Sequence, residues 1–113
     1  MSFPIAVIGA GGWGTALAIA LSRANREVRL WTFESYLVET ILATRENPLY
    51  LPGARIPESV RVTNAIEETL DGAGIVIIAA HFVLSGDQTL QICQLFFSCI
   101  QFAVDQFPEF SKF

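Results

Sequence analysis

Basic residues are scarce in this chain. Lysine and arginine together number 7 among 113 residues, against 11 acidic residues, so the net charge is −4. Proteins that bind nucleic acid neutralise backbone phosphates with clustered lysine and arginine side chains. No such cluster occurs here, and the composition therefore argues against nucleic acid as a partner.

Histidine and cysteine are equally scarce. His81 is the single histidine, and the two cysteines are Cys93 and Cys99. This spacing matches no zinc-binding motif, so we predict no metal site. Both cysteines are expected to be buried free thiols in a reducing compartment, which predicts a cytoplasmic protein.

Long apolar runs are missing as well. A membrane span requires about 20 mainly apolar residues, and the longest apolar stretch is interrupted by Ser98 and Gln101. The N-terminal Met-Ser-Phe-Pro carries none of the basic residues that begin a signal peptide. We therefore expect neither a membrane span nor a signal peptide.

A glycine motif near the N-terminus is the most informative feature that is present. The apolar run 5–8 leads into Gly-Ala-Gly-Gly-Trp-Gly at 9–14, and an alanine-rich helical pattern follows. In a strand–turn–helix of this kind, Gly9 permits the sharp turn, Gly11 leaves room for a pyrophosphate, and Gly14 lets the helix approach the strand. The phosphates would lie at the helix N-terminus. A tight turn that binds no ligand is the alternative.

An acidic residue follows at the distance expected for ribose recognition. Glu34 lies twenty residues after Gly14 and just beyond the expected strand 28–32. A carboxylate at this place accepts a hydrogen bond from the 2′-hydroxyl of an adenosine ribose and repels a 2′-phosphate. No arginine stands beside Glu34, although Arg55 or Arg61 could approach from elsewhere in the chain. We predict NAD as the cofactor, with NADP less favoured.

The remaining elements alternate between strands and helices. Strands are expected at 4–8, 28–32 or 33, 60–63 and 75–79, and helices at 12–24, 36–44 and 65–70. Ser35 is the expected N-cap of the second helix, with Leu37, Ile41 and Leu42 facing inward. The segment 47–57 contains three prolines and is expected to be neither helix nor central strand.

This order predicts an α/β fold, a Rossmann-like doubly wound parallel sheet. The sheet is incomplete, with about four strands in spatial order 3-2-1-4. The continuous apolar runs 5–8 and 75–79 predict adjacent central strands, buried on both faces. In the first helix, the spacing predicts one buried apolar face formed by Trp13, Leu17, Ala20, Leu21 and Ala24.

Two domains are expected: a dinucleotide-binding domain over 1–83 and an apolar, helical tail over 84–113. In the tail, apolar residues recur at steps of three and four. The tail either covers the sheet or forms a contact with another domain or subunit. A contact between subunits through the tail would make a homo-oligomer.

Residues 9–18 resemble the fingerprint of the NAD(P)-dependent glycerol-3-phosphate dehydrogenase family, except that the family usually has serine, alanine or a similar small residue where Gly12 stands. The likeness continues through 30–34, through 47–53 with Pro57, and ends with the strand 75–79, so it covers about residues 4–80. The resemblance implies that Gly9, Gly11 and Gly14 hold the pyrophosphate, with Gly12 and Trp13 beside it. It also implies that Phe33 lies against the adenine and Glu34 near the adenosine ribose.

After Ala79 the likeness ends. The family continues with a valine-proline turn, then a catalytic lysine and a helical substrate domain, whereas this chain has Ala80-His81-Phe82. Lys112 lies in no recognisable motif, and His81 is expected to be a loop residue rather than an acid–base catalyst. We predict no catalytic residue in this chain. A frameshift, altered splicing, a gene-model error or a natural truncation would each place unrelated sequence after the strand.

Three functions remain open. The resemblance implies an oxidoreductase that transfers hydride between NAD(H) and the dihydroxyacetone phosphate/glycerol 3-phosphate pair, with those substrates bound only in a full-length relative. The alternatives are a non-catalytic dinucleotide-binding module and an inactive truncated fragment. We expect the chain by itself to be inactive.

Overall fold

The computed structural model describes residues 3–24 and 26–79, which fall in one compact unit, Met1–His81. The predicted helical tail lies outside the described residues, together with His81, both cysteines and Lys112.

Nine elements follow one another in the described part. They are β1 (Ile5–Ile8), α1 (Gly12–Arg23), β2 (Val28–Trp31), α2 (Ser35–Thr44), β3 (Glu46–Asn47), β4 (Leu51–Arg55), β5 (Arg61–Thr63), α3 (Ile66–Leu70) and β6 (Ile75–Ile78).

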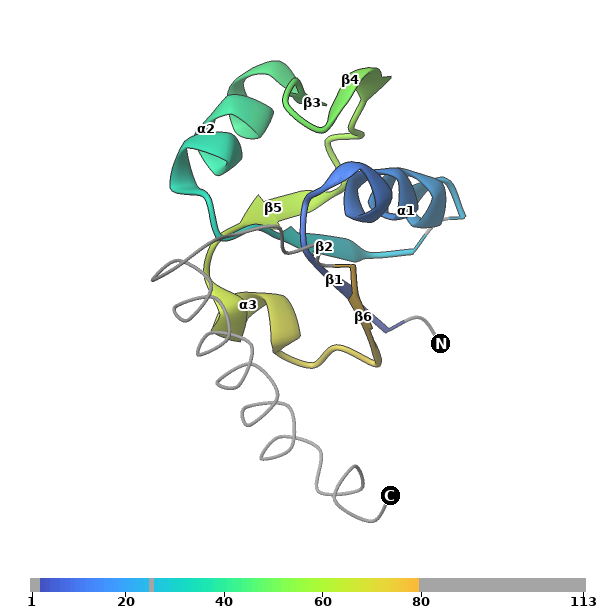
Figure 1. Cartoon of the computed structure of the whole chain (residues 1–113). Helices are drawn as coiled ribbons and strands as arrows, with labels where there is room; N and C mark the ends of the chain where they lie inside the picture. The colour runs from blue at the N-terminus through green and yellow to red at the C-terminus, as the bar shows by residue number, and fades with distance from the viewer. Residues whose placement is uncertain (1–2, 25, 80–113) are drawn as a thin grey trace. The chain divides into compact units, whose positions relative to one another are not determined.

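Four of the strands form a parallel sheet in the order β5-β2-β1-β6, with α1 and α2 on one side and α3 on the other (Figure 1). The four predicted strands correspond, in chain order, to β1, β2, β5 and β6, so the observed order is the predicted 3-2-1-4. Ile5 pairs with Val28 on one side and with Ile75 on the other. The α/β, Rossmann-like class is confirmed, and so is the pairing of the two apolar runs.

The core lies between the sheet and the pair α1–α2. Alternate strand residues point to this face, because side chains of a strand alternate between its two sides. The buried cluster includes Val7 and Leu30 from the sheet, Ala18 from α1, and Leu37 and Ile41 from α2. Each large apolar side chain buried here contributes about 1.5–3 kcal/mol.

The buried face of α1 differs from the prediction. Its buried residues are Gly14, Thr15, Ala18 and Ile19, whereas the side chain of Trp13 is 80% exposed. The helix is apolar on nearly every side, so hydrophobic spacing does not select a face. The close approach of Gly14 to the strand sets the rotation of the helix instead.

Two details of α2 also differ. Glu34, not Ser35, is the N-cap residue, and it makes no side-chain capping hydrogen bond. Leu37 and Ile41 are buried as predicted, but Leu42 is exposed because it lies beyond the face that meets the sheet.

Strand β6 is less buried than its sequence suggested. Ile75 and Ile78 are each about half exposed, and among the described strands β6 pairs with β1 alone. Helix α1 packs on β1 and β2, and α3 packs on β1, β2 and β5. The prediction of a central strand buried on both faces is therefore wrong for β6 within the described residues.

The proline-rich segment forms a hairpin that the sequence did not reveal. Strands β3 and β4 pair with each other, antiparallel, in a separate sheet, so the segment is indeed not a central strand. Arg45, which ends α2 with a left-handed backbone (φ 54°), donates hydrogen bonds to the carbonyls of Ile56 (3.2 Å), Pro57 and Val60 (2.9 Å). These bonds fasten the hairpin's exit to the end of α2.

None of the helices within the described residues is long and apolar enough to cross a membrane.

Candidate functional site

The turn between β1 and α1 is built by glycine. Gly9 has φ 117°, a conformation that residues with a Cβ rarely adopt, and its N–H donates to the carbonyl of Trp31 at 2.8 Å. Gly11 is the N-cap of α1 and provides no side-chain cap. The first turn of α1 contains no acidic residue, so no carboxylate of that turn offsets the positive end of the helix dipole. This end of α1 can receive an anion.

Three glycines of this turn have three different surroundings. A Cβ at Gly14 would overlap the carbonyl oxygen of Gly9. A Cβ at Gly12 would lie 3.1 Å from the carbonyl oxygen of Tyr50, which is tight, and a Cβ at Gly11 would meet no atom within 4 Å. Gly14 therefore serves helix–strand packing, whereas the space beside Gly11 is open to a ligand.

Glu34 lies at the same edge of the sheet, because β1 and β2 are parallel neighbours and Glu34 follows the carboxyl end of β2. Its Oε1 accepts a hydrogen bond from the hydroxyl of Tyr50 at 3.1 Å. Its Oε2 is buried and has no hydrogen-bond partner among the described residues. A buried carboxylate oxygen costs free energy unless it is hydrogen-bonded, so this atom is suited to receive a donor from a ligand.

Two aromatic side chains predicted to flank the cofactor are accessible. Trp13, on the first turn of α1, is largely exposed, and Phe33, directly before Glu34, is about half exposed. The structure thus brings all seven predicted residues to one edge of the sheet, and their binding role stays a prediction.

Sequence reasoning missed two residues of this region, both in the hairpin. Asn47 is fully buried, and its side-chain nitrogen donates to the carbonyl of Ala10 (2.8 Å) and to the hydroxyl of Thr15 (2.9 Å). Tyr50 contacts Glu34, as described above. Both residues lie in the motif 47–53. No rule of sequence spacing assigns a buried asparagine, or a tyrosine between prolines, to this site.

The two tyrosines of the chain lie near Glu34, and both have raised pKa values. Desolvation, and then the charge of Glu34, raise the pKa of Tyr50 and of Tyr36 above the ordinary value of 10.0. The stability that the protonated phenols provide is fully present below pH 10 and is lost as the pH rises through the raised values. We expect Glu34→Gln to lower both pKa values, since it removes the negative charge.

The measurement is an alkaline titration of tyrosinate absorbance, and the chain has only 2 tyrosines to report. The unfolded chain, in which both phenols titrate near the ordinary value, is the control. Superimposable curves for parent and variant would show that Glu34 does not face the phenols.

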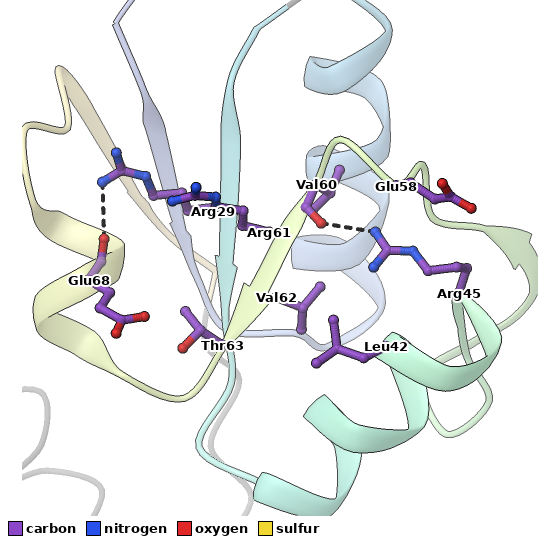
Figure 2. Close-up of a pocket in the computed structure, with 9 residues that line it drawn as sticks. All are labelled: Arg29, Leu42, Arg45, Glu58, Val60, Arg61, Val62, Thr63 and Glu68. Carbon is purple, nitrogen blue, oxygen red and sulfur yellow. Dashed lines mark hydrogen bonds between the residues drawn. The ribbon is translucent and has the colours of Figure 1, made fainter.

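A cavity of about 340 Å³ lies elsewhere, along β5 (Figure 2). None of the seven predicted residues lines it. Arg29 donates to the carbonyl of Glu68 at 3.0 Å, and Arg45 donates to that of Val60. These guanidinium groups hold neighbouring backbone together, so the cavity is a structural feature of the edge of β5 and not the candidate site.

Within residues 3–24 and 26–79, no group of three or more histidine, cysteine, aspartate or glutamate side chains could hold a metal ion.

Known proteins resemble this chain, and the match to the family model runs to residue 95, beyond the expected end of the likeness at about residue 80. The family model described as the NAD-dependent glycerol-3-phosphate dehydrogenase N-terminus matches residues 4–95. A glycerol-3-phosphate dehydrogenase (NAD(P)+) of Koribacter versatilis is 55% identical over 82 residues, covering 70% of this chain and 24% of the relative. The Xanthomonas campestris enzyme of the same name is 43% identical over 79 residues, covering 68% of this chain and 23% of the relative.

Solved structures agree with the sequence matches. The crystal structure of glycerol-3-phosphate dehydrogenase from Coxiella burnetii has a TM-score of 0.65 and 40% identity, over 68% of this chain and 24% of that one. The chain spans about a quarter of the length of the curated relatives that it matches.

Proposed function

Because the chain belongs to the NAD-dependent glycerol-3-phosphate dehydrogenase family, we propose that its described part binds NAD at the carboxyl edge of the parallel sheet. The observation that carries this proposal is the carboxylate of Glu34, whose buried Oε2 has no partner among the described residues and lies at the same sheet edge as the glycine turn. The open space at Gly11 supports it from the other end of the site.

Each part of the cofactor has a matching part of the chain. Backbone N–H groups at the start of α1 bind the pyrophosphate, which Gly11 allows to approach closely. The carboxylate of Glu34 accepts a hydrogen bond from a hydroxyl of the adenosine ribose, and Phe33 and Trp13 flank the ligand with their exposed rings. Bound NAD supplies the hydride chemistry; these residues only bind and orient it.

Glu34 also favours NAD over NADP. A 2′-phosphate would place negative charge against a carboxylate that forms no salt bridge among the described residues. The two arginines considered as compensation lie elsewhere: Arg55 forms an ion pair with Glu58 at 3.4 Å, and Arg61 stands at the amino end of β5 opposite Arg29. Neither position is that of Glu34, which follows the carboxyl end of β2.

We expect calorimetry to show NAD binding at least about tenfold more tightly than NADP, a difference of about 1.4 kcal/mol. Glu34→Gln is the matched control: it keeps the shape of the side chain, removes the charge, and should bring the two affinities close together. Equal affinities in the parent, or tighter NADP binding, would refute the charge argument. No binding of either dinucleotide would refute the proposed function.

For the whole reaction, we propose hydride transfer between NAD(H) and the dihydroxyacetone phosphate/glycerol 3-phosphate pair, which follows from the family. No catalytic residue is predicted in this chain, so we propose that the described residues contribute the dinucleotide half of the site. A non-catalytic dinucleotide-binding module is the second candidate, because every residue of the site that we describe serves binding.

A further inference from the structure

A continuous set of hydrogen bonds joins the two ends of the candidate site through the β3–β4 hairpin. The side-chain nitrogen of Asn47 donates to the carbonyl of Ala10 in the glycine turn. The side-chain oxygen of Asn47 accepts from the backbone N–H of Tyr50 at 3.2 Å. The hydroxyl of Tyr50 then donates to Glu34 Oε1. The hairpin therefore connects the pyrophosphate end of the site to its ribose end.

We propose that Tyr50 is a positioning residue that sets the choice between NAD and NADP by holding the carboxylate of Glu34. This inference rests on the proposed function, since it assigns the specificity of that same site. Tyr50 acts through Glu34 and not by contact with the reacting atoms.

The two carboxylate oxygens of Glu34 have different surroundings. Oε1 accepts the hydrogen bond of the phenol, whereas Oε2 is buried and has no hydrogen-bond partner among the described residues. Glu34 makes no side-chain capping hydrogen bond to α2, so the cap does not hold this carboxylate. A hydrogen bond to an ionised acceptor is directional and stronger than a neutral one. The phenol therefore restricts the rotation of the carboxylate, which in the proposed complex lies at the ribose and opposes a 2′-phosphate.

Tyr50 is itself held in place. Its backbone N–H is bound by the fully buried Asn47, and its carbonyl oxygen lies 3.1 Å from the position that a Cβ on Gly12 would occupy. The backbone of Tyr50 is thus anchored against the glycine turn, and its side chain reaches Glu34 from there. The raised pKa of Tyr50 keeps the phenol protonated, and so able to donate, throughout the neutral range.

The test is a double-mutant cycle with Tyr50→Phe and Glu34→Gln, in which NAD and NADP affinities of the full chain are measured by calorimetry. Tyr50→Phe removes only the hydroxyl from a side chain that is about half exposed. We expect it to reduce the preference for NAD about fivefold, mainly by weakening NAD, with the melting temperature unchanged. In the Glu34→Gln background the same substitution should have no further effect on the preference.

The outcomes separate the two proposals. If the parent binds neither dinucleotide, the proposed function fails and this inference fails with it. If Glu34→Gln abolishes a preference that Tyr50→Phe leaves intact, the proposed function stands and the role of Tyr50 is refuted. A Tyr50→Phe effect that persists in the Glu34→Gln background would refute action through the carboxylate. A merely structural role would lower the melting temperature and weaken both dinucleotides equally, which also refutes the inference.

Discussion

Replacing Gly14 with alanine is expected to destabilise the fold by about 3 kcal/mol or more, which is the upper range for forcing a methyl group into a packed site. The added Cβ would overlap the carbonyl oxygen of Gly9, a backbone atom of the turn that cannot rotate away as a side chain would. Relief requires α1 to move off β1, and the buried contacts of Ala18 and Ile19 would loosen with it. Thermal unfolding should show a melting temperature lower by about 12 °C or more.

Gly11→Ala is the matched control for this variant. It makes the same substitution three residues away, where the backbone is extended (φ −75°) and a Cβ meets no atom within 4 Å. Because Gly11 is the N-cap residue, where alanine is less favoured than glycine, the cost should be up to about 1 kcal/mol, well below that of the Gly14 variant. Equal melting temperatures for the Gly14 variant and the parent would show that the helix does not approach the strand as the structure has it.

The order and pairing of the parallel strands were predictable because two independent signals agree there. Ile5–Ile8 and Ile75–Ile78 are continuous apolar runs, and the right-handed crossover rule leaves few ways to arrange them. The glycine turn was predictable for a similar reason. Gly9 and Gly14 each meet a local steric demand that only glycine satisfies, and local demands are visible in the sequence.

The buried face of α1 could not be predicted, because the signal itself was ambiguous. In a helix that carries apolar residues on nearly every side, periodicity offers several faces of similar hydrophobicity. The choice is made by packing of the helix on the strand, where Gly14 approaches Gly9, and the exposure of Trp13 is its consequence.

The hairpin at 46–55 shows a different limit. The three prolines of segment 47–57, two of which lie within the hairpin, correctly excluded a helix and a central strand, but they do not exclude a short antiparallel pair beside the sheet. The side chain of Asn47 forms hydrogen bonds with residues that lie 37 and 32 positions away along the chain, and that of Tyr50 with a residue 16 positions away. Such partners depend on the tertiary fold, so the link between the glycine turn and Glu34 becomes visible only in the structure.

Gly11→Val tests NAD binding separately from folding, because Gly11, unlike Gly14, has open space beside it in the same turn. Valine is suited to the extended backbone of this N-cap residue, and its Cβ would enter open space. The fold should therefore remain intact by circular dichroism and thermal melting.

In the proposed complex that open space belongs to the pyrophosphate, which the branched side chain would push away from the N–H groups at the start of α1. We expect Gly11→Val to weaken NAD binding about 100-fold or more, about 2.7 kcal/mol, in calorimetric titrations. Gly11→Ala, with a smaller side chain at the same position, should fall between the variant and the parent. A valine variant that binds NAD as tightly as the parent would show that the pyrophosphate does not lie at this turn, whereas a variant that fails to fold would show that Gly11 is needed for the turn itself.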